Sequence, residues 1–178
     1  MITPINKLIA VVFASLFLSA CGAEQTTTQT LSGAPGQISS SSKSIERPFL
    51  TVYKDPNCGC CKHWITHVEE HGYATKTIHP QDLWAVKAQY KIASNMQSCH
   101  TAVTKEGYVF EGHVPAKFMD KFLANPPKGA IGLTVPAMVV GSPGMEVGDK
   151  FKAYHIMLLN KDGSNKLYQA IDSYQQQF

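Results

Sequence analysis

Residues 49–61 read FLTVYKDPNCGCC, and this stretch decides the fold of the chain. Its first five residues are mostly apolar or β-branched, which predicts a buried strand over 49–53. The turn sequence DPN at 55–57 follows and leads directly into three cysteines. A helix is expected over 60–70, because apolar residues such as Trp64 recur on one of its faces. A strand, a cysteine-rich turn and a helix therefore open the folded part.

The next segment adds a second strand and a second helix. Residues 73–78 predict the strand, and residues 80–90 predict the helix, with Leu83, Val86 and Tyr90 turned inward. Both tryptophans of the chain fall at core-like positions of the two helices. A strand–helix–strand unit predicts two parallel strands joined by a right-handed crossover.

The second half of the chain predicts two hairpins with a helix and a loop between them. Residues 101–104 and 108–111 flank the turn sequence KEG, which is typical of a hairpin. The remaining predicted elements are a helix at 116–123, a Gly/Pro-rich loop at 129–148 and hairpin strands at 154–159 and 167–171.

This order of elements resembles the thioredoxin fold. In that fold a C-x-x-C pair follows the first strand, and Cys58 and Cys61 stand in that place. A cis-proline precedes the hairpin there, whereas this chain has His100 preceded by Cys99, with His113 in the neighbouring loop. The expected fold class is α/β, a thioredoxin-like three-layer fold with a C-terminal Gly/Pro-rich loop and a β-hairpin extension.

The first residues carry export features. Residues 1–20 contain a short apolar run that is too short for a spanning helix, which predicts a lipoprotein signal peptide. Leu18-Ser19-Ala20-Cys21 resembles the bacterial lipobox and implies cleavage before Cys21 and a lipid on its sulfur. An ordinary secretory signal cut near Ala23 is the alternative. Either reading predicts a protein of the cell envelope that faces the periplasm, and Gly22 after the lipidated cysteine resembles a sorting signal for the outer membrane.

Composition separates a tether from one folded domain. Residues 21–47 are rich in Ser, Thr, Gln and Gly, which predicts a lipidated, disordered tether. Residues 48–173 are long enough for one packed domain, and a short tail follows at 174–178. The formal net charge of +3 is small and the lysines are scattered, so nucleic acid is excluded as a partner.

The spacing of the cysteines indicates a functional site rather than a set of structural disulfides. An oxidising compartment makes two disulfides one reading of the four cysteines after the export signal. However, Cys58, Cys60 and Cys61 are too crowded to look like structural disulfides. With Cys99 and His100 they form a set of soft donors that favours Cu(I), with zinc and iron–sulfur clusters as competitors. The surplus of ligands favours a multinuclear copper cluster over a single ion.

Two further sets of residues are candidate metal donors. Met138 and Met145 lie in the Gly/Pro-rich loop, and their thioethers are either copper ligands or ordinary packing groups. His63, His67 and His71 recur along the first helix. We read them as a helix face in solvent rather than as a second metal site.

Five motifs in order extend the resemblance to a particular family. They are NCGCC, SCHTA, EGHVP, VPAM and SPGMEV, at residues 57–61, 98–102, 111–115, 135–138 and 142–147. Together they resemble the exported CopG-type copper-resistance family, from about residue 49 to residue 170. The resemblance implies a periplasmic copper-binding protein with a thioredoxin-like fold. It places the ligands at Cys58, Cys60, Cys61, Cys99 and His100, with His113, Met138 and Met145 as contributors. Ala137 departs from the family, which often has glycine there.

The function expected from these features is binding of copper for resistance or trafficking. The expected partners are copper ions, the membrane through the lipid anchor, and copper-efflux or copper-carrier proteins of the envelope. The alternative is a thiol-disulfide or copper-dependent oxidoreductase with Cys58 as nucleophile and Cys61 as resolving thiol. The missing cis-proline and the extra Cys60 weigh against that enzyme. A structural lipoprotein with two disulfides is the third reading.

Overall fold

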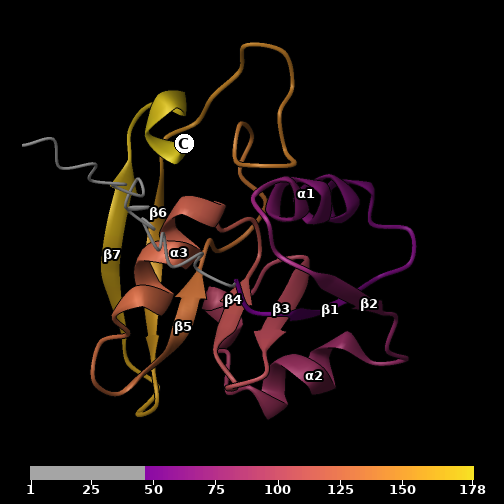
Figure 1. Cartoon of the computed structure of the whole chain (residues 1–178), viewed down its shortest axis with the longest axis vertical. Helices are drawn as coiled ribbons and strands as arrows, with labels where there is room; N and C mark the ends of the chain where they lie inside the picture. Colours follow the sequence, from indigo (N-terminus) through magenta and orange to yellow (C-terminus); the bar gives the residue numbers. More distant parts are fainter. Residues whose placement is uncertain (1–46) are drawn as a thin grey trace, which may run out of the picture. The chain divides into compact units, whose positions relative to one another are not determined.

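The computed structural model describes residues 47–178, which form one mixed seven-stranded sheet with helices packed against it (Figure 1). The strands lie in the order β2-β1-β3-β4-β5-β6-β7. In chain order the elements are β1 (Leu50–Lys54), α1 (Gly59–Glu70), β2 (Thr75–Ile78), α2 (Leu83–Gln89), η1 (Ser94–Met96), β3 (His100–Thr104), β4 (Val109–Glu111), α3 (Ala116–Ala124), β5 (Ala130–Thr134), β6 (Tyr154–Asn160), β7 (Asn165–Ile171) and η2 (Tyr174–Gln177).

The predicted signal peptide, the lipidation site Cys21 and nearly all of the predicted tether lie outside the described residues. Within residues 47–178, no helix combines the length and apolar character needed to cross a membrane.

The first four strands come from the predicted strand–helix–strand unit and the predicted hairpin. β1 and β2 pair in parallel, which confirms the parallel pairing expected from the strand–helix–strand unit. β3 pairs antiparallel with β1 and places His100 opposite Lys54, and β4 pairs antiparallel with β3. The α/β class is therefore confirmed, while the finer assignment to the thioredoxin fold stays a prediction.

Helices cover both faces of the sheet. Figure 1 shows α1 and α2 on opposite sides of β1 and β3. The main core cluster includes Trp64 of α1 and Phe122 of α3, whereas a smaller cluster forms around Ile92, just after α2. Phe110 belongs to the main cluster and its neighbour Val109 to the smaller one. Successive strand side chains therefore serve opposite faces, as the pleat of a strand requires.

The Gly/Pro-rich stretch begins with a strand rather than a loop. Residues Ala130–Thr134 form β5, which pairs in parallel with β4 and antiparallel with β6. Gly132 shows why this strand is hard to see in the sequence. A Cβ at Gly132 would lie 1.8 Å from the carbonyl oxygen of Val109, so only glycine allows this approach of two backbones. The loop itself begins after β5 and carries both predicted methionine ligands.

Helix α2 turns Leu83, Val86 and Tyr90 toward the protein as predicted, but it differs from the prediction at its start and at Trp84. Its N-cap is Asp82, whose side chain accepts the N–H of Ala85 at 3.0 Å, so the helix begins later than expected. The predicted core position of Trp84 is wrong, because this side chain is 69% exposed. The buried residue of α2 is instead Lys87. The ammonium group of Lys87 forms an ion pair inside the protein. Helical periodicity in the sequence does not reveal this contact.

The last residues pack onto the domain. Gln177 of η2 is buried, and its Oε1 accepts the hydroxyl of Tyr154 at 2.6 Å. Its Nε2 donates to the carbonyl oxygen of Gly141 at 2.9 Å. These bonds connect the chain end to β6 and to the loop that precedes it.

Candidate metal centre

The cysteine cluster lies at the start of α1. Cys58 is the N-cap, and its sulfur accepts the backbone N–H of Cys61 at 3.3 Å. The preceding turn is held by Asp55, whose Oδ1 accepts the N–H of Asn57 at 2.7 Å. Unpaired N–H groups and the positive end of the helix dipole surround a sulfur in this position. The predicted turn therefore delivers Cys58 to a place that favours thiolate.

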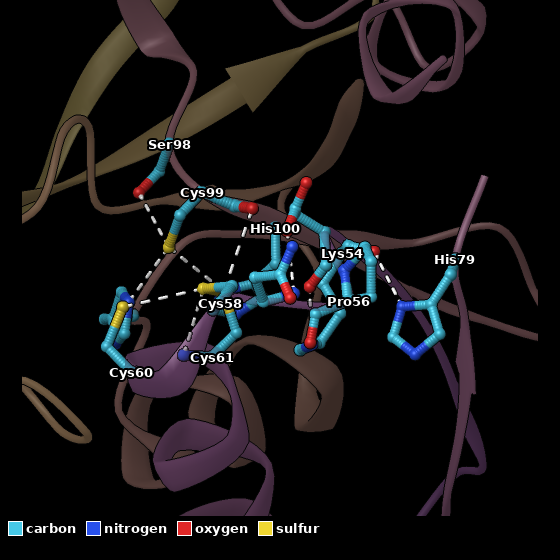
Figure 2. The surroundings of a disulfide bond; sticks show 12 residues. Lys54, Pro56, Cys58, Cys60, Cys61, His79, Ser98, Cys99 and His100 are labelled. Carbon is cyan, nitrogen blue, oxygen red and sulfur yellow. Dashed lines mark hydrogen bonds between the residues drawn. A yellow bond between two sulfur atoms is a disulfide. The ribbon is translucent and has the colours of Figure 1, made fainter. Parts of the chain in front are cut away.

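Of the four cysteines within residues 47–178, two are oxidised and two are free. Cys58 and Cys61 form a disulfide, and Cys60 and Cys99 remain thiols (Figure 2). Cys60 Sγ lies 3.6 Å from Cys58 Sγ, and Cys61 Sγ lies 3.8 Å from the carbonyl oxygen of Cys99. A disulfide and two free thiols thus share one cluster.

Cys99 and His113 are in direct contact. Cys99 Sγ lies 3.0 Å from His113 Nε2, and His113 Nδ1 lies 2.8 Å from the carbonyl oxygen of Pro143. A carbonyl only accepts, so Nδ1 carries the proton and Nε2 presents its lone pair to the sulfur. Burial lowers the pKa of His113, which keeps the ring neutral. Proteins orient metal-binding histidines in the same way, through a backbone carbonyl on the other ring nitrogen.

Burial keeps Cys99 protonated in the absence of a metal. Desolvation, assisted by the neighbouring Cys60, raises the pKa of the Cys99 thiol to about 12. The S–H group therefore donates toward His113 Nε2. Because the thiolate is the metal ligand, an ion that binds here must displace this proton.

His100 is fully buried against Trp64. The two ring centroids lie 4.3 Å apart, and the indole N–H donates to the carbonyl oxygen of Val114 at 2.9 Å. Burial lowers the pKa of His100 well below its usual value, so the ring is neutral. Its Nδ1 lies 3.4 Å from Cys99 Sγ, whereas its Nε2 has no hydrogen-bond partner among the described residues. A buried polar atom without a hydrogen-bond partner costs free energy of folding. Such atoms are rare in folded proteins and are typical of functional groups.

The donors form two groups that share Cys99. The first consists of the four cysteines, and the second consists of Cys99, His100 and His113. In each group, one candidate ligand atom per residue lies within 4.8 Å of the others. The structure therefore brings together the predicted thiol and imidazole donors Cys58, Cys60, Cys61, Cys99, His100 and His113.

The two predicted methionine ligands lie on segments beside this centre. Met138 is 60% exposed and follows Ala137, a non-glycine residue with φ of +64°. Met145 is half-buried and follows Gly144, whose backbone packs against α1. The role of either sulfur as a ligand stays a prediction.

Lys54 is a member of the site that the sequence analysis missed. Its side chain is 1% exposed and lies at the end of β1, opposite His100 on β3 (Figure 2). Its Nζ donates to the carbonyl oxygen of Asp55 at 2.6 Å, and desolvation lowers its pKa. A cation near Cys60 and Cys99 offsets negative charge on thiolates. The available signal was a lysine at the end of an apolar strand, directly before the turn.

Two of the three histidines along α1 and its C-cap, His67 and His71, have hydrogen-bond partners. His67 Nε2 accepts the backbone N–H of Ala116 at 3.1 Å, at the first residue of α3. His71 Nδ1 lies 2.7 Å from the carbonyl oxygen of His67. Among residues 47–178, the groups of Cys, His, Asp and Glu that could hold a metal do not include these histidines. The expected solvated face is correct for His63, which is exposed, whereas His67 and His71 are half-buried and have hydrogen-bond partners.

The fold and the two donor groups define an α/β protein with a candidate soft-metal centre. Comparison with known structures identifies its family. The chain belongs to the CopG-type copper-resistance family. It is 39% identical to form 2 of the copper resistance protein CopG, with a TM-score of 0.67, over 71% of this chain and 99% of that chain. Form 1 gives 38% identity and a TM-score of 0.67, over 72% of this chain and 100% of that chain.

A family model supports the same region of the chain. The family is described as a protein of unknown function, DUF411, and it matches residues 96–145. This range contains Cys99, His100, His113 and both candidate methionines. No curated protein matches the chain.

Proposed function

We propose that this protein binds copper as Cu(I) through its cysteine and histidine cluster and serves copper resistance or trafficking. The observation that carries the proposal is the position of Cys99, which belongs to both donor groups and faces the lone pair of His113. Thiolates and neutral imidazoles are ligands that suit Cu(I). Membership in a copper-resistance family supports copper over zinc as the cargo.

The donor set supports a cluster of more than one copper ion. Six thiol and imidazole donors exceed the need of a single ion, and Cys99 is placed to serve both groups. The disulfide between Cys58 and Cys61 withholds two sulfurs in its oxidised form. The full copper load therefore requires the reduced pair.

The proposed place of action is the cell envelope. The lipobox-like sequence ending at Cys21 supports a lipid anchor, and the Ser/Thr/Gln-rich segment after it supports a tether. The domain then faces the periplasm, with the outer membrane favoured over the inner one. The proposed partners are copper ions and the copper-efflux or copper-carrier proteins of the envelope.

Copper counting under competition tests this proposal. Purified protein is reduced anaerobically, freed of reductant, and titrated with Cu(I) in the presence of a chromophoric chelator. Copper bound per chain is then measured by elemental and native mass spectrometry. Two variants probe the shared group, Cys99→Ser and His113→Ala. His155→Ala is the matched control, because His155 is exposed on β6.

The proposal predicts submicromolar binding by the wild-type protein and a clear loss in both site variants. His155→Ala should retain the wild-type stoichiometry. Failure of the wild-type protein to hold copper at micromolar chelator would refute a copper function. Full stoichiometry in Cys99→Ser would instead mean that the site lies elsewhere.

A second function is supported by one specific observation. Cys58 and Cys61 form a disulfide at the start of a helix, which is the arrangement of a thiol-disulfide oxidoreductase. In such a reaction the disulfide takes two electrons and two protons from a substrate dithiol, which becomes a disulfide. The free thiol of Cys60 lies 3.6 Å from Cys58 and competes as an internal nucleophile. This position favours the metal-binding function over exchange with a substrate.

Insulin reduction separates the two functions and runs this reaction in reverse, because the reduced Cys58–Cys61 pair gives two electrons and two protons to an insulin disulfide and itself becomes the disulfide. An oxidoreductase loses activity in Cys58→Ser and keeps it in Cys60→Ser. A copper-binding protein shows little activity in either variant, and both variants bind less copper than the wild-type protein.

A further inference from the structure

A buried ion pair lies on the face of the sheet opposite the cluster. Lys87 of α2 and Glu111 of β4 have side chains that are 2% and 0% exposed, with Nζ 2.5 Å from Oε1. Thr101 Oγ1 donates to Glu111 Oε2 at 2.6 Å and accepts from Lys87 Nζ at 3.1 Å. Removing two charges from water costs free energy that their attraction only partly offsets. Stability alone is therefore a weak reason for this pair.

The Glu111 carboxylate also holds the backbone that carries Cys99. Its Oε1 accepts the N–H of Ser98 at 2.7 Å. Ser98 directly precedes Cys99, and Glu111 lies two residues before His113. One carboxylate therefore joins the two segments whose side chains meet in the Cys99–His113 contact.

Close packing transmits any displacement of these segments. A Cβ on Gly112 would lie 2.5 Å from the side chain of Ser98 and 2.6 Å from the carbonyl oxygen of Val135. The N–H of Gly112 donates to the carbonyl oxygen of His100 at 2.9 Å. A shift of Ser98 must therefore move the turn that carries His113.

We propose that the Lys87–Glu111 pair is a positioning device that holds Cys99 and His113 at ligand distance and so sets the copper affinity of their group. The proposal rests on the proposed copper function. The carboxylate accepts three donors at once, from Lys87, Thr101 and the Ser98 N–H. Lys87 supplies the positive charge that stabilises the buried carboxylate. Glutamine has one acceptor oxygen and an NH₂ group that donates. In Glu111→Gln this NH₂ group would therefore face at least one of the three groups that donate to the carboxylate.

The test is Cu(I) competition on the reduced full chain. Glu111→Gln is expected to weaken copper binding by about tenfold or more, the usual effect of losing a group that orients a metal ligand. Thr101→Val keeps the ion pair and removes one donor, so it should weaken binding less. X-ray absorption of the copper-loaded protein should show a smaller nitrogen share in Glu111→Gln. A merely structural role would not change this ligand ratio.

The matched control is another ion pair of the described domain. Arg47 and Asp120 pair at 2.9 Å with both side chains about one-third exposed, and Arg47 precedes the end of β1 remote from Lys54. Asp120→Asn should change copper affinity by no more than about twofold. Circular dichroism and thermal unfolding report whether each variant is folded.

Each outcome decides the proposal. Loss of affinity in folded Glu111→Gln with a wild-type-like Asp120→Asn supports it. Equal loss in Asp120→Asn, or unchanged affinity and nitrogen share in Glu111→Gln, overturns it. If Glu111→Gln does not fold, weakened binding in Thr101→Val supports the proposal and unchanged binding overturns it. A wild-type protein without copper affinity refutes the proposed function as well, whereas the other failures leave that function standing.

Discussion

Cys99 Sγ lies 3.0 Å from His113 Nε2, although the two residues are 14 positions apart. They flank the β3–β4 hairpin, in which Thr101 pairs with Glu111. β4 ends at Glu111, and Gly112, with φ of +71°, then turns the chain so that His113 reaches Cys99. The hairpin and this turn together set the thiol–imidazole contact, and the carbonyl oxygen of Pro143 fixes which imidazole nitrogen faces the sulfur.

Reduction of the disulfide is expected to raise the amount of copper bound at saturation. The oxidised protein offers only the thiols of Cys60 and Cys99, whereas reduction frees Cys58 and Cys61 as well. Anaerobic copper counting on oxidised and reduced protein measures the difference. A Cys58→Ser, Cys61→Ser double variant is the control, because its copper content should not respond to reductant. Equal copper content in oxidised and reduced wild-type protein would contradict the expectation.

Copper binding is expected to quench the fluorescence of Trp64. This indole is buried and its ring centroid lies 4.3 Å from that of His100, while Trp84 is 69% exposed. A Trp84→Phe variant isolates the buried emission, which should fall as Cu(I) is added. Trp64→Phe is the control, in which the emission of Trp84 should respond little. Strong quenching of Trp84 alone would place the metal away from His100.

Substitution of Gly144 by alanine is expected to damage both stability and copper binding. Gly144 has φ of +84°, and a Cβ there would lie 2.5 Å from the backbone nitrogen of Trp64. The substitution pushes the loop off α1 and withdraws the Pro143 carbonyl from His113. We expect a loss of about 3 kcal/mol in the free energy of unfolding, from the backbone conformation and the overlap together.

Gly163→Ala is the matched control for this substitution. Gly163 has φ of +83° and open space around its Cβ position, so it isolates the backbone contribution of about 1 kcal/mol. Its copper affinity should equal that of the wild-type protein. Chemical denaturation and chelator competition measure both quantities. Similar losses in the free energy of unfolding at the two glycines would show that the loop at Gly144 moves away from α1 at no added cost.

Acid is expected to destabilise the domain through His67. Burial, followed by the neighbouring His71, lowers the pKa of His67 from 6.5 to about 4. Between these values the unfolded chain binds more protons than the folded one, so stability falls as pH decreases from about 6.5 to about 4. A proton on Nε2 would also face the N–H of Ala116. Because the ring is partly exposed, we expect a contribution of about 1–2 kcal/mol.

His67→Gln tests this pH dependence. Glutamine retains an acceptor for the Ala116 N–H but does not titrate, so the stability of the variant should depend less steeply on pH. Denaturant unfolding at a series of pH values gives the two slopes. His63→Gln, at an exposed position of the same helix, should keep the wild-type slope. An unchanged slope in His67→Gln would assign the acid sensitivity to other groups.

Much of the fold was predictable because local patterns express it. Alternating or continuous apolar residues identified most strands, and the turn sequence KEG marked the first hairpin. Strand β5 was missed because Gly132 replaces a side chain with a close backbone approach that only the β4 partner explains. The prediction of a core position for Trp84 was wrong because helical periodicity assigns buried positions to apolar residues. In α2 the buried residue is the charged Lys87.

The donor residues of the candidate centre can be identified from the sequence. Crowded cysteines, a Cys-His pair and EGHVP identify soft ligands, since thiol and imidazole chemistry belongs to the residues themselves. Their arrangement follows from the folded chain: Cys99 joins two donor groups, and His113 faces it with a lone pair. Lys54 and the Lys87–Glu111 pair lie around them. These relations depend on distances between strands and loops that are remote in the chain. Burial then sets their protonation, because desolvation acts on a folded interior and not on a sequence.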